Sequence, residues 1–386
     1  MKITVDKPYL TKLTQELVRI NSINPLLSPD GKGETEIGMF VAEKLKELGL
    51  DVTVSEVAPK RVNVVGVLKG TGSGKSLLLN AHMDTVGIES MTIDPFGGEL
   101  REGRIYGRGA QDMKGSLAAM LAAAKAIQDA GIRLRGDLLI TGVADEEYSS
   151  IGTEALVKQF KADGAIVTEP TDMYLCRAHR GFIWFEVETT GRAAHGSRYK
   201  EGIDANMRMG RFLYELEKLE QELLQRKGHE LTGPPSLHAA LIQGGTEVSK
   251  YAERCKLTIE RRTVPGETVE GATTELQRII DRLAEADSTF KATVKVLFWR
   301  EPFEVPADAE IVQIIDKVLG EHLGQHNEHT GQTFWTDAAL TSVAGMETVL
   351  LGPKGYGLHS AEEWVEIDSV ANLASVLAET AIQYCG

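Results

Sequence analysis

Three short, mostly apolar runs constrain the fold of this 386-residue chain more than any other feature of its sequence. The runs lie at Ser76–Asn80, Asp137–Ala144 and Ala165–Thr168. A strand without polar alternation must be covered on both faces, which is typical of a parallel sheet flanked by helices. Helical patterns at 8–21, 34–48 and Lys114–Ala130 alternate with such strands along the first half of the chain. This alternation predicts an α/β domain with a mostly parallel sheet.

The middle of the chain shows a different pattern, in which polar and apolar residues alternate. The alternating segments are Phe182–Thr190, 255–263 and Phe290–Phe298. Such alternation is typical of strands with one buried and one solvated face, and the helical patterns 204–227 and Thr268–Ala286 separate these strands. We therefore expect a small α+β (ferredoxin-like) domain at 178–298. It would be inserted into a discontinuous α/β domain formed by 1–177 and 299–386.

Charge and cysteine usage limit the classes of partner. Acidic residues number 56 and basic residues 42, which gives a formal net charge of −14. A negative field of this size disfavours nucleic acid and anionic lipid surfaces as partners. Cys176, Cys255 and Cys385 form no Cys-x-x-Cys pair, which argues against a disulfide framework and a thiolate zinc site. Because no signal-peptide pattern or long apolar run is present, we expect a cytoplasmic protein with no membrane partner.

Acidic and histidine side chains follow the predicted buried strands or lie in nearby loops at five places. They are His82 with Asp84, Asp112, the triplet Asp145–Glu147, Glu169, and His359. Taken singly, each has an ordinary structural explanation, such as a helix cap or a solvated charge run. Together they form nitrogen and oxygen donors at the strand ends where ligands of open α/β sheets gather. That set suits Zn²⁺ or a similar divalent ion, and two such ions sharing a carboxylate can activate water for attack on a carbonyl.

Five motifs that contain these residues occur in order along the chain. They are AHMDTV, GRGAQDMKG, ADEE, TEP and GLHSAEEW. Because all five motifs occur in this order, the sequence resembles the dinuclear zinc hydrolases. This family includes aminoacylase, acetylornithine deacetylase, succinyl-diaminopimelate desuccinylase and glutamate carboxypeptidase. The resemblance covers nearly the whole chain. It implies a metallopeptidase-like catalytic domain, an inserted domain that acts as lid and dimerisation domain of a homodimer, and two divalent ions per chain. Zinc is the default, and Co²⁺ or Mn²⁺ could occupy the same ligands.

The resemblance also implies which residues hold each metal. His82 and Glu169 would bind the first ion. Glu147 and His359 would bind the second ion. Asp112 would bridge the two.

Four further residues receive roles from the same resemblance. Asp84 would contact the His82 imidazole on the side away from the metal and so orient it. Glu146 would be the general base and proton shuttle. In the inserted domain, His195 of the GRAAHGS segment would reach the partner subunit's site and stabilise the oxyanion. Arg262 of IERRTVPGE would bind a substrate carboxylate, since a guanidinium can bind it through two hydrogen bonds. Strand alternation sends the neighbouring Arg261 to the other face.

Two positions bear on the substrate and leave it open. Ser249 stands where related sequences commonly carry an asparagine that contacts substrate, so the substrate is in doubt although the metal chemistry is not. Asp337, in the segment TFWTDAAL, could bind an amine group of the substrate, and it could equally be a helix N-cap.

These observations predict a metal-dependent amidohydrolase that cleaves an N-acyl amino acid, in the manner of acetylornithine deacetylase. A dipeptidase or carboxypeptidase of the same mechanism is the first alternative. A non-catalytic binding relative is the second, and the intact set of ligands with Glu146 argues against it. The GTGSGKS segment at 70–76 resembles a phosphate-binding loop only superficially, because it lacks the required spacing and precedes a strand.

Overall fold

A computed structural model describes residues 3–325 and 328–386 of the chain. The chain divides into two compact units. The first unit contains Met1–Arg177, Val305–Thr330 and Thr336–Gly386, and the second contains Ala178–Glu304 and Gly331–Trp335. The sequence placed the second boundary at 298–299. In the structure the last long strand of the insertion, β12 (Lys291–Arg300), extends beyond that point.

The large sheet contains nine strands among the described residues, and eight of them form one continuous path. The path is β1 (Asp51–Ala58), β2 (Arg61–Leu68), β6 (Leu138–Val143), β3 (Leu77–His82), β7 (Gly164–Val167), β15 (Glu347–Leu350), β8 (Leu175–His179) and β13 (Phe303–Glu304). The ninth strand, β14 (His329–Gln332), pairs with β8. The expected α/β class is confirmed. Along this path, parallel pairing is confined to the four central strands β6, β3, β7 and β15, and the outer pairs are antiparallel, so the sheet is mixed.

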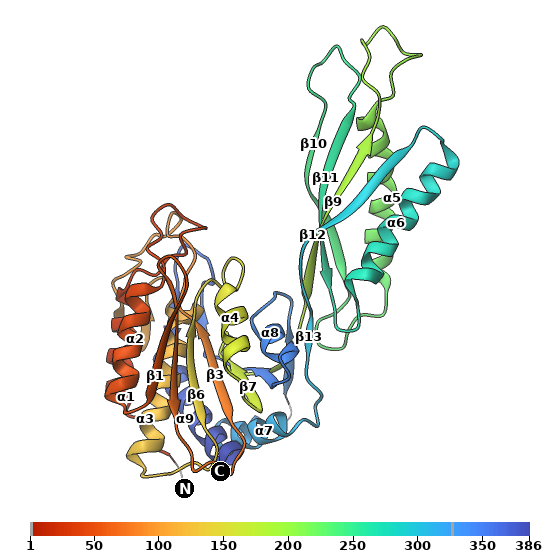
Figure 1. The fold of residues 1–386 in the computed structure, drawn as a ribbon. Coiled ribbons are helices and arrows are strands. Elements are labelled where there is room, and N and C mark those ends of the chain that lie inside the picture. The colour runs from red at the N-terminus through yellow and green to blue at the C-terminus, as the bar shows by residue number, and fades with distance from the viewer. Residues whose placement is uncertain (1–2, 326–327) are drawn as a thin grey trace. The chain divides into compact units, whose positions relative to one another are not determined.

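Helices of the first unit cover both faces of its sheet (Figure 1). They are α1 (Lys7–Arg19), α2 (Thr35–Glu47), α3 (Gly115–Asp129), α4 (Ile151–Gln159), α7 (Glu310–Leu323), α8 (Ala338–Val343) and α9 (Ile367–Cys385). Leu156 of α4 shares a buried cluster with Val65 of β2. Gly38 of α2 lies against Val64, the preceding residue of that strand. Since successive side chains of a strand point to opposite faces, α4 and α2 lie on opposite sides. The central strands are therefore buried on both faces, as their apolar runs require.

A second, smaller sheet in this unit brings two distant loops together. Its strands are β16 (Gly355–Tyr356), β17 (Trp364–Glu366), β5 (Arg104–Tyr106) and β4 (Glu99–Arg101), in that order. The pairing of Val365 with Ile105 joins a C-terminal strand to one that lies about 260 residues earlier. As a result, the loop between β16 and β17 lies beside the π-helical turn η1 (Ala110–Lys114), which leads into α3.

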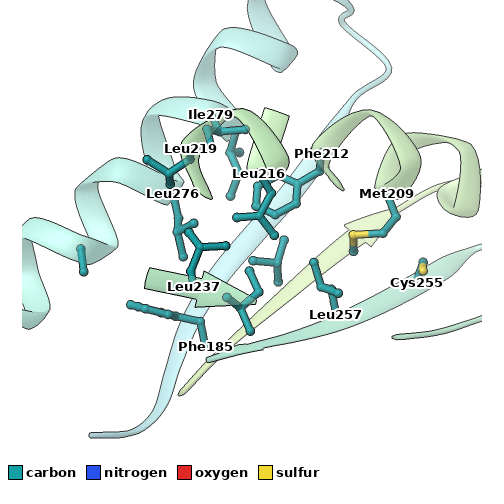
Figure 2. Close-up of a cluster of buried hydrophobic side chains, with 14 of the residues drawn as sticks. Phe185, Met209, Phe212, Leu216, Leu219, Leu237, Cys255, Leu257, Leu276 and Ile279 are labelled. Carbon is teal, nitrogen blue, oxygen red and sulfur yellow. The ribbon is translucent and has the colours of Figure 1, made fainter. Parts of the chain in front are cut away.

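The second unit has the order β9 (Gly181–Thr190), α5 (Ala205–Gln225), β10 (Ser236–Gly244), β11 (Arg254–Thr263), α6 (Val269–Ala286) and β12. Its four strands form one antiparallel sheet in the order β10-β11-β9-β12. This is the ferredoxin-like βαββαβ arrangement. Figure 2 shows its core, in which Phe185 and Leu257 of the strands meet Phe212 and Ile279 of the helices. Both helices therefore cover the same face of the sheet. Across residues 3–325 and 328–386, no helix is long and apolar enough to cross a membrane.

Candidate metal centre and active site

Three of the acidic and histidine sites lie at one edge of the large sheet. His82 is the last residue of β3, Glu146 and Glu147 follow β6, and Glu169 follows β7. These strands are neighbours and run parallel. Their carboxyl ends therefore meet at the same edge, where ligands of open α/β sheets gather.

The smaller sheet and the turn before α3 supply the remaining two sites. Asp112 lies in η1, directly before the buried helix α3. His359 lies in the loop between β16 and β17, in the left-handed region with a φ of 56°. The pairing of β5 with β17 holds these two segments side by side. The five sites, which span residues 82 to 359 in sequence, thus belong to one region of the first unit.

The donor atoms form two groups that share one carboxylate. In the first group, the Nε2 atom of His82 lies 3.0 Å from Oδ1 of Asp112 and 3.8 Å from Oε1 of Glu169. In the second, the Nε2 atom of His359 lies 3.4 Å from Oδ2 of Asp112 and 3.0 Å from Oε2 of Glu147. Within each group the donor atoms lie no more than 4.8 Å apart. Asp112 thus presents one oxygen to each group, as a bridging ligand would.

Electrostatics indicate that this cluster fits positive ions. Burial raises the pKa of Glu147 and Glu169 above the usual value, and neighbouring carboxylates raise both further. Burial also acts to raise the pKa of Asp112, but hydrogen bonds with the two histidines hold it below its ordinary value. Hydrogen bonds with Asp112 and Glu147 raise the pKa of His359 to about 10. Buried carboxylates packed this closely are ionised at low cost only with cations beside them, and the nitrogen and oxygen donors suit Zn²⁺ and related divalent ions.

The two adjacent glutamates occupy different positions. Glu147 lies beside His359, whereas Glu146 belongs to neither donor group among the described residues. Burial raises the pKa of Glu146 well above its usual value, and the charge of Glu169 adds to this shift. The two glutamates that the sequence could not order therefore differ in geometry: Glu147 faces a donor group, and Glu146 lies outside both groups.

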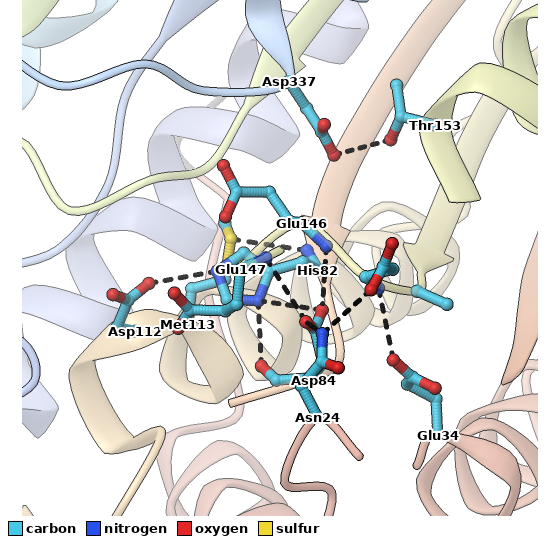
Figure 3. A network of polar contacts seen from close by, with 12 residues as sticks. Asn24, Glu34, His82, Asp84, Asp112, Met113, Glu146, Glu147, Thr153 and Asp337 are labelled. Carbon is cyan, nitrogen blue, oxygen red and sulfur yellow. Dashed lines mark hydrogen bonds and ion pairs between the residues drawn. The ribbon is translucent and has the colours of Figure 1, made fainter. Parts of the chain in front are cut away.

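The carboxylate of Asp84 has partners that the sequence did not suggest. The Nδ1 atom of His82 lies 2.9 Å from the main-chain oxygen of Asp84, but 3.7 Å from the nearest carboxylate oxygen (Figure 3). The carboxylate instead accepts hydrogen bonds from the main-chain amides of Glu146 and Glu147, at 3.1 and 3.3 Å, and from the side chain of Asn24. The imidazole is thus oriented by the backbone, and the Asp84 side chain holds the turn that carries the two glutamates.

Two buried arginines form ion pairs that support the site, and the sequence did not reveal them. Arg61 pairs with Glu34 at 2.5 Å and with Asp145 at 3.0 Å, next to the glutamate turn. Arg108 pairs with Glu363 at 2.7 Å, next to Asp112. Glu363 belongs to the AEEW run, which resembles an ordinary solvated charge cluster, and only its spacing from His359 could have drawn attention to it.

Asp337 is buried in the same region of the first unit. It precedes α8, yet its side chain makes no capping hydrogen bond to that helix. Instead, its Oδ2 atom accepts a hydrogen bond of 2.6 Å from Thr153, as Figure 3 shows. Burial raises the pKa of Asp337 to about 6. The helix-cap explanation is therefore wrong for this side chain.

The second unit carries the other predicted residues, each described within that unit. The imidazole of His195 is exposed, and its Nδ1 atom lies 2.9 Å from Oγ of Ser197. Ser249 accepts a hydrogen bond from Gly196 through its main-chain oxygen. Arg261 is buried and pairs with Glu267 and with Glu275 on the helix-covered face of the sheet.

Arg262 lies on the opposite, open face of that sheet. It pairs with Glu260 and stacks over the ring of Phe182 at 5.5 Å. The predicted difference between the two arginines is thus visible in their surroundings. Arg261 is a structural residue, whereas about a third of the Arg262 side chain is exposed, at 34%.

The fold and the site together define a class: an α/β protein with a candidate dinuclear metal centre at the carboxyl ends of its parallel strands. Comparison with known proteins gives the family. Residues 78–383 match Peptidase family M20/M25/M40. The chain belongs to this family, whose members are hydrolases acting on amide bonds.

Individual relatives cover nearly the full chain. An acetylornithine deacetylase of Myxococcus xanthus is 30% identical and covers 98% of both chains. An N-formyl-4-amino-5-aminomethyl-2-methylpyrimidine deformylase of Bacillus subtilis is 28% identical, over 100% of this chain and 96% of the relative. Among solved structures, a tripeptidase from Staphylococcus aureus superposes with a TM-score of 0.80 at 23% identity, covering 99% of each chain. A dinuclear metal-binding M20 peptidase of Bacillus subtilis gives 0.76 at 15% identity, with 98% of each chain covered. These structural similarities confirm the fold.

Proposed function

We propose that the protein removes a small acyl group from nitrogen, with an N-acetylated amino acid as the first choice of substrate. One observation carries the proposal. Asp112 offers one oxygen to each of two donor groups, and a further carboxylate, Glu146, lies beside them outside both groups. The two relatives named above act as a deacetylase and a deformylase, so both remove a one- or two-carbon acyl group. Removal of a formyl group is therefore the second candidate.

The site's residues fit two divalent ions, with zinc as the proposed metal. His82, Asp112 and Glu169 would hold one ion, and Asp112, Glu147 and His359 the other. When bound, such a pair polarises the substrate carbonyl and lowers the pKa of a shared water.

Glu146 is the proposed general base. Its carboxylate takes a proton from the attacking water while the hydroxyl group adds to the amide carbon. The same carboxyl group then delivers that proton to the amide nitrogen as the C–N bond breaks, which releases a carboxylic acid and a free amine. The position of Glu146 suits this shuttle, because its carboxylate lies beside both donor groups and belongs to neither.

We further propose that the active form is a cytoplasmic homodimer joined through the second unit. Strand β10 is an edge strand of that sheet, and Leu241 and Ile242 on it are 70% and 59% exposed. An open, apolar edge of this kind favours pairing with another chain. In the dimer, His195 would stabilise the oxyanion in the partner's site, and Arg262 would bind the substrate carboxylate. The free, buried cysteines support a reducing compartment.

A substrate panel tests the proposal directly. Purified metal-loaded protein is assayed with N-acetyl, N-formyl and N-succinyl amino acids beside dipeptides, by release of free amine. We expect acetyl or formyl substrates to be cleaved best, and hydrolysis of dipeptides alone would favour the peptidase alternative.

Replacing Glu146 tests the proposed base on the best substrate of that panel. The Glu146→Gln variant keeps the shape of the side chain but cannot carry a proton. We expect kcat to fall about 10²-fold or more, the low end of what general acid–base catalysis supplies, with metal content unchanged. A variant that keeps nearly wild-type kcat would refute the assignment.

A further inference from the structure

Glu363 is the most heavily hydrogen-bonded carboxylate near the metal centre. Its side chain is fully buried and accepts four hydrogen bonds. Oε1 accepts from the main-chain amides of Gln111 and Asp112, at 2.9 and 3.1 Å. Oε2 accepts from the amide of Gly109 at 3.0 Å and from Nη1 of Arg108 at 2.7 Å. All four donors belong to four neighbouring residues of the turn that carries the bridging aspartate.

These hydrogen bonds fix the shape of that turn. Three main-chain N–H groups point at one carboxylate, which is possible because Gly109 adopts a left-handed conformation with a φ of 80°. A side chain at position 109 would approach Thr85 to 2.8 Å, so the glycine is required sterically as well. Burying an ionised carboxylate is costly unless every acceptor position is used. The charge of Glu363 is therefore stable only while the 109–112 turn keeps this conformation.

Arg108 connects the same carboxylate to the loop that carries His359. Its Nη2 atom donates to the main-chain oxygen of Ser360 at 3.1 Å, and its Nε atom donates to Gly87 at the same distance. Ser360 is the residue after His359, and Glu363 follows four residues after that histidine. The Arg108–Glu363 pair thus joins the Asp112 turn to the His359 loop, although the two lie about 250 residues apart.

The two donor groups depend on this connection unequally. The second group takes both Asp112 and His359 from the joined segments, and only Glu147 comes from elsewhere. The first group takes Asp112 alone, because His82 and Glu169 come from the ends of β3 and β7. Loosening the connection should therefore disturb two of three donors in one group and one of three in the other.

We infer that Glu363, together with Arg108, is a positioning residue for the second metal site. It sets the relative placement of Asp112 and His359 and so determines the affinity for the second ion. This inference rests on the proposed two-metal function. It extends that function by assigning a role to a buried pair that touches neither the substrate nor an ion.

Metal titration of the Glu363→Gln variant tests the inference without an activity assay. The amide keeps the size of the side chain but places an NH₂ group against main-chain N–H donors and removes the negative charge that pairs with Arg108. Metal-free protein is titrated with Co²⁺ by calorimetry and by visible absorption. We expect the second binding step to weaken by about 10–100-fold, the range typical of residues that orient metal ligands, while the first changes by less than about threefold.

Three further variants separate positioning from a general loss of stability. Glu267→Gln breaks a comparable pair with the buried Arg261 in the second unit, and should leave both binding steps unchanged. Glu147→Gln removes a donor of the second site, so its Co²⁺ spectrum is the reference for protein that holds one ion. At one equivalent of Co²⁺, the spectrum of Glu363→Gln should be similar to this reference. If Glu363→Gln does not fold, Arg108→Lys replaces it. Lysine keeps the charge but cannot reach Glu363, Ser360 and Gly87 together.

The outcomes distinguish this inference from the function on which it rests. Suppose that the wild-type protein binds two ions and that Glu363→Gln weakens both binding steps equally, or neither. This result overturns the positioning role and leaves the two-metal proposal intact. A wild-type protein that binds a single ion overturns both. Selective loss of the second step, with the Glu267→Gln control unchanged, supports the inference.

Discussion

Replacing Asp84 distinguishes two roles for a residue that the sequence placed behind His82. If its carboxylate oriented the imidazole, the substitution would weaken the first metal site. In the structure the imidazole contacts the main-chain oxygen of Asp84, which every substitution retains. The carboxylate itself holds the amides of Glu146 and Glu147. We therefore expect Asp84→Asn to act on catalysis and on the second site while the first site is spared.

The magnitude follows from the hydrogen bonds that are lost. Each bond to a charged acceptor contributes about 1.5–3 kcal/mol, and two main-chain donors are involved, so about 3–6 kcal/mol holds the turn in place. Part of this is retained in Asp84→Asn, because the amide oxygen still accepts one bond, and because Asp145 remains held by Arg61 and Asn24. We expect kcat to fall about 10–100-fold, as for other residues that support catalytic groups.

The assay measures kcat and KM on the best substrate of the panel, with metal content determined in parallel. The expected result is a lower kcat and a retained first ion. The reasoning is refuted if Asp84→Asn loses the first ion while the metal-loaded fraction works at the wild-type rate. That result would mean that the carboxylate acts through the imidazole after all.

Three further predictions address the bridge, the dimer and the thiols. Asp112→Ala should lose both ions, since both donor groups use this residue, and elemental analysis that finds two tightly held ions would contradict the bridging role. Mixing inactive His195→Ala and Glu146→Gln proteins should restore about a quarter of the activity, because random exchange makes about half of the dimers mixed and each has one complete site. No recovery despite demonstrated exchange would exclude action across subunits. Burial raises the pKa of Cys385 to about 12, so little thiolate is present at pH 8. A thiol reagent should therefore label Cys385 only slowly in the native protein. Fast labelling before unfolding would contradict the burial of this thiol.

The buried strands of the fold could be predicted because a strand that is buried on both faces has a nearly continuous run of apolar residues. β3, β6 and β7 are mostly apolar and buried along their whole length, and all were found within two residues of their observed ends. β10 was missed for the opposite reason. Seven of its nine residues are exposed, so it shows no alternation between buried and solvated positions. Its place in the sheet is set by pairing with β11, which the sequence of β10 does not reveal.

The candidate ligands were predictable, but their supports were not. His82, Asp112 and His359 carry side chains whose type and order suggested metal binding. The contacts of Asp84 and Glu363 are mostly to main-chain amides, and every residue except proline has an amide to offer. No residue type therefore marks the donors, and such contacts become visible only when the chain is folded. This is why the sequence did not reveal the main-chain contacts of Asp84, and why Glu363 was overlooked.

The order of segments along the chain has a consequence for biosynthesis. β15 lies between β7 and β8 in the sheet, yet 167 residues lie between the end of β8 at 179 and the start of β15 at 347. His359 is synthesised later still. A chain emerging from the ribosome therefore lacks both His359 and Glu363, the carboxylate that holds the Asp112 turn, until its C-terminal segment is made. The second ion should enter only after translation has passed His359.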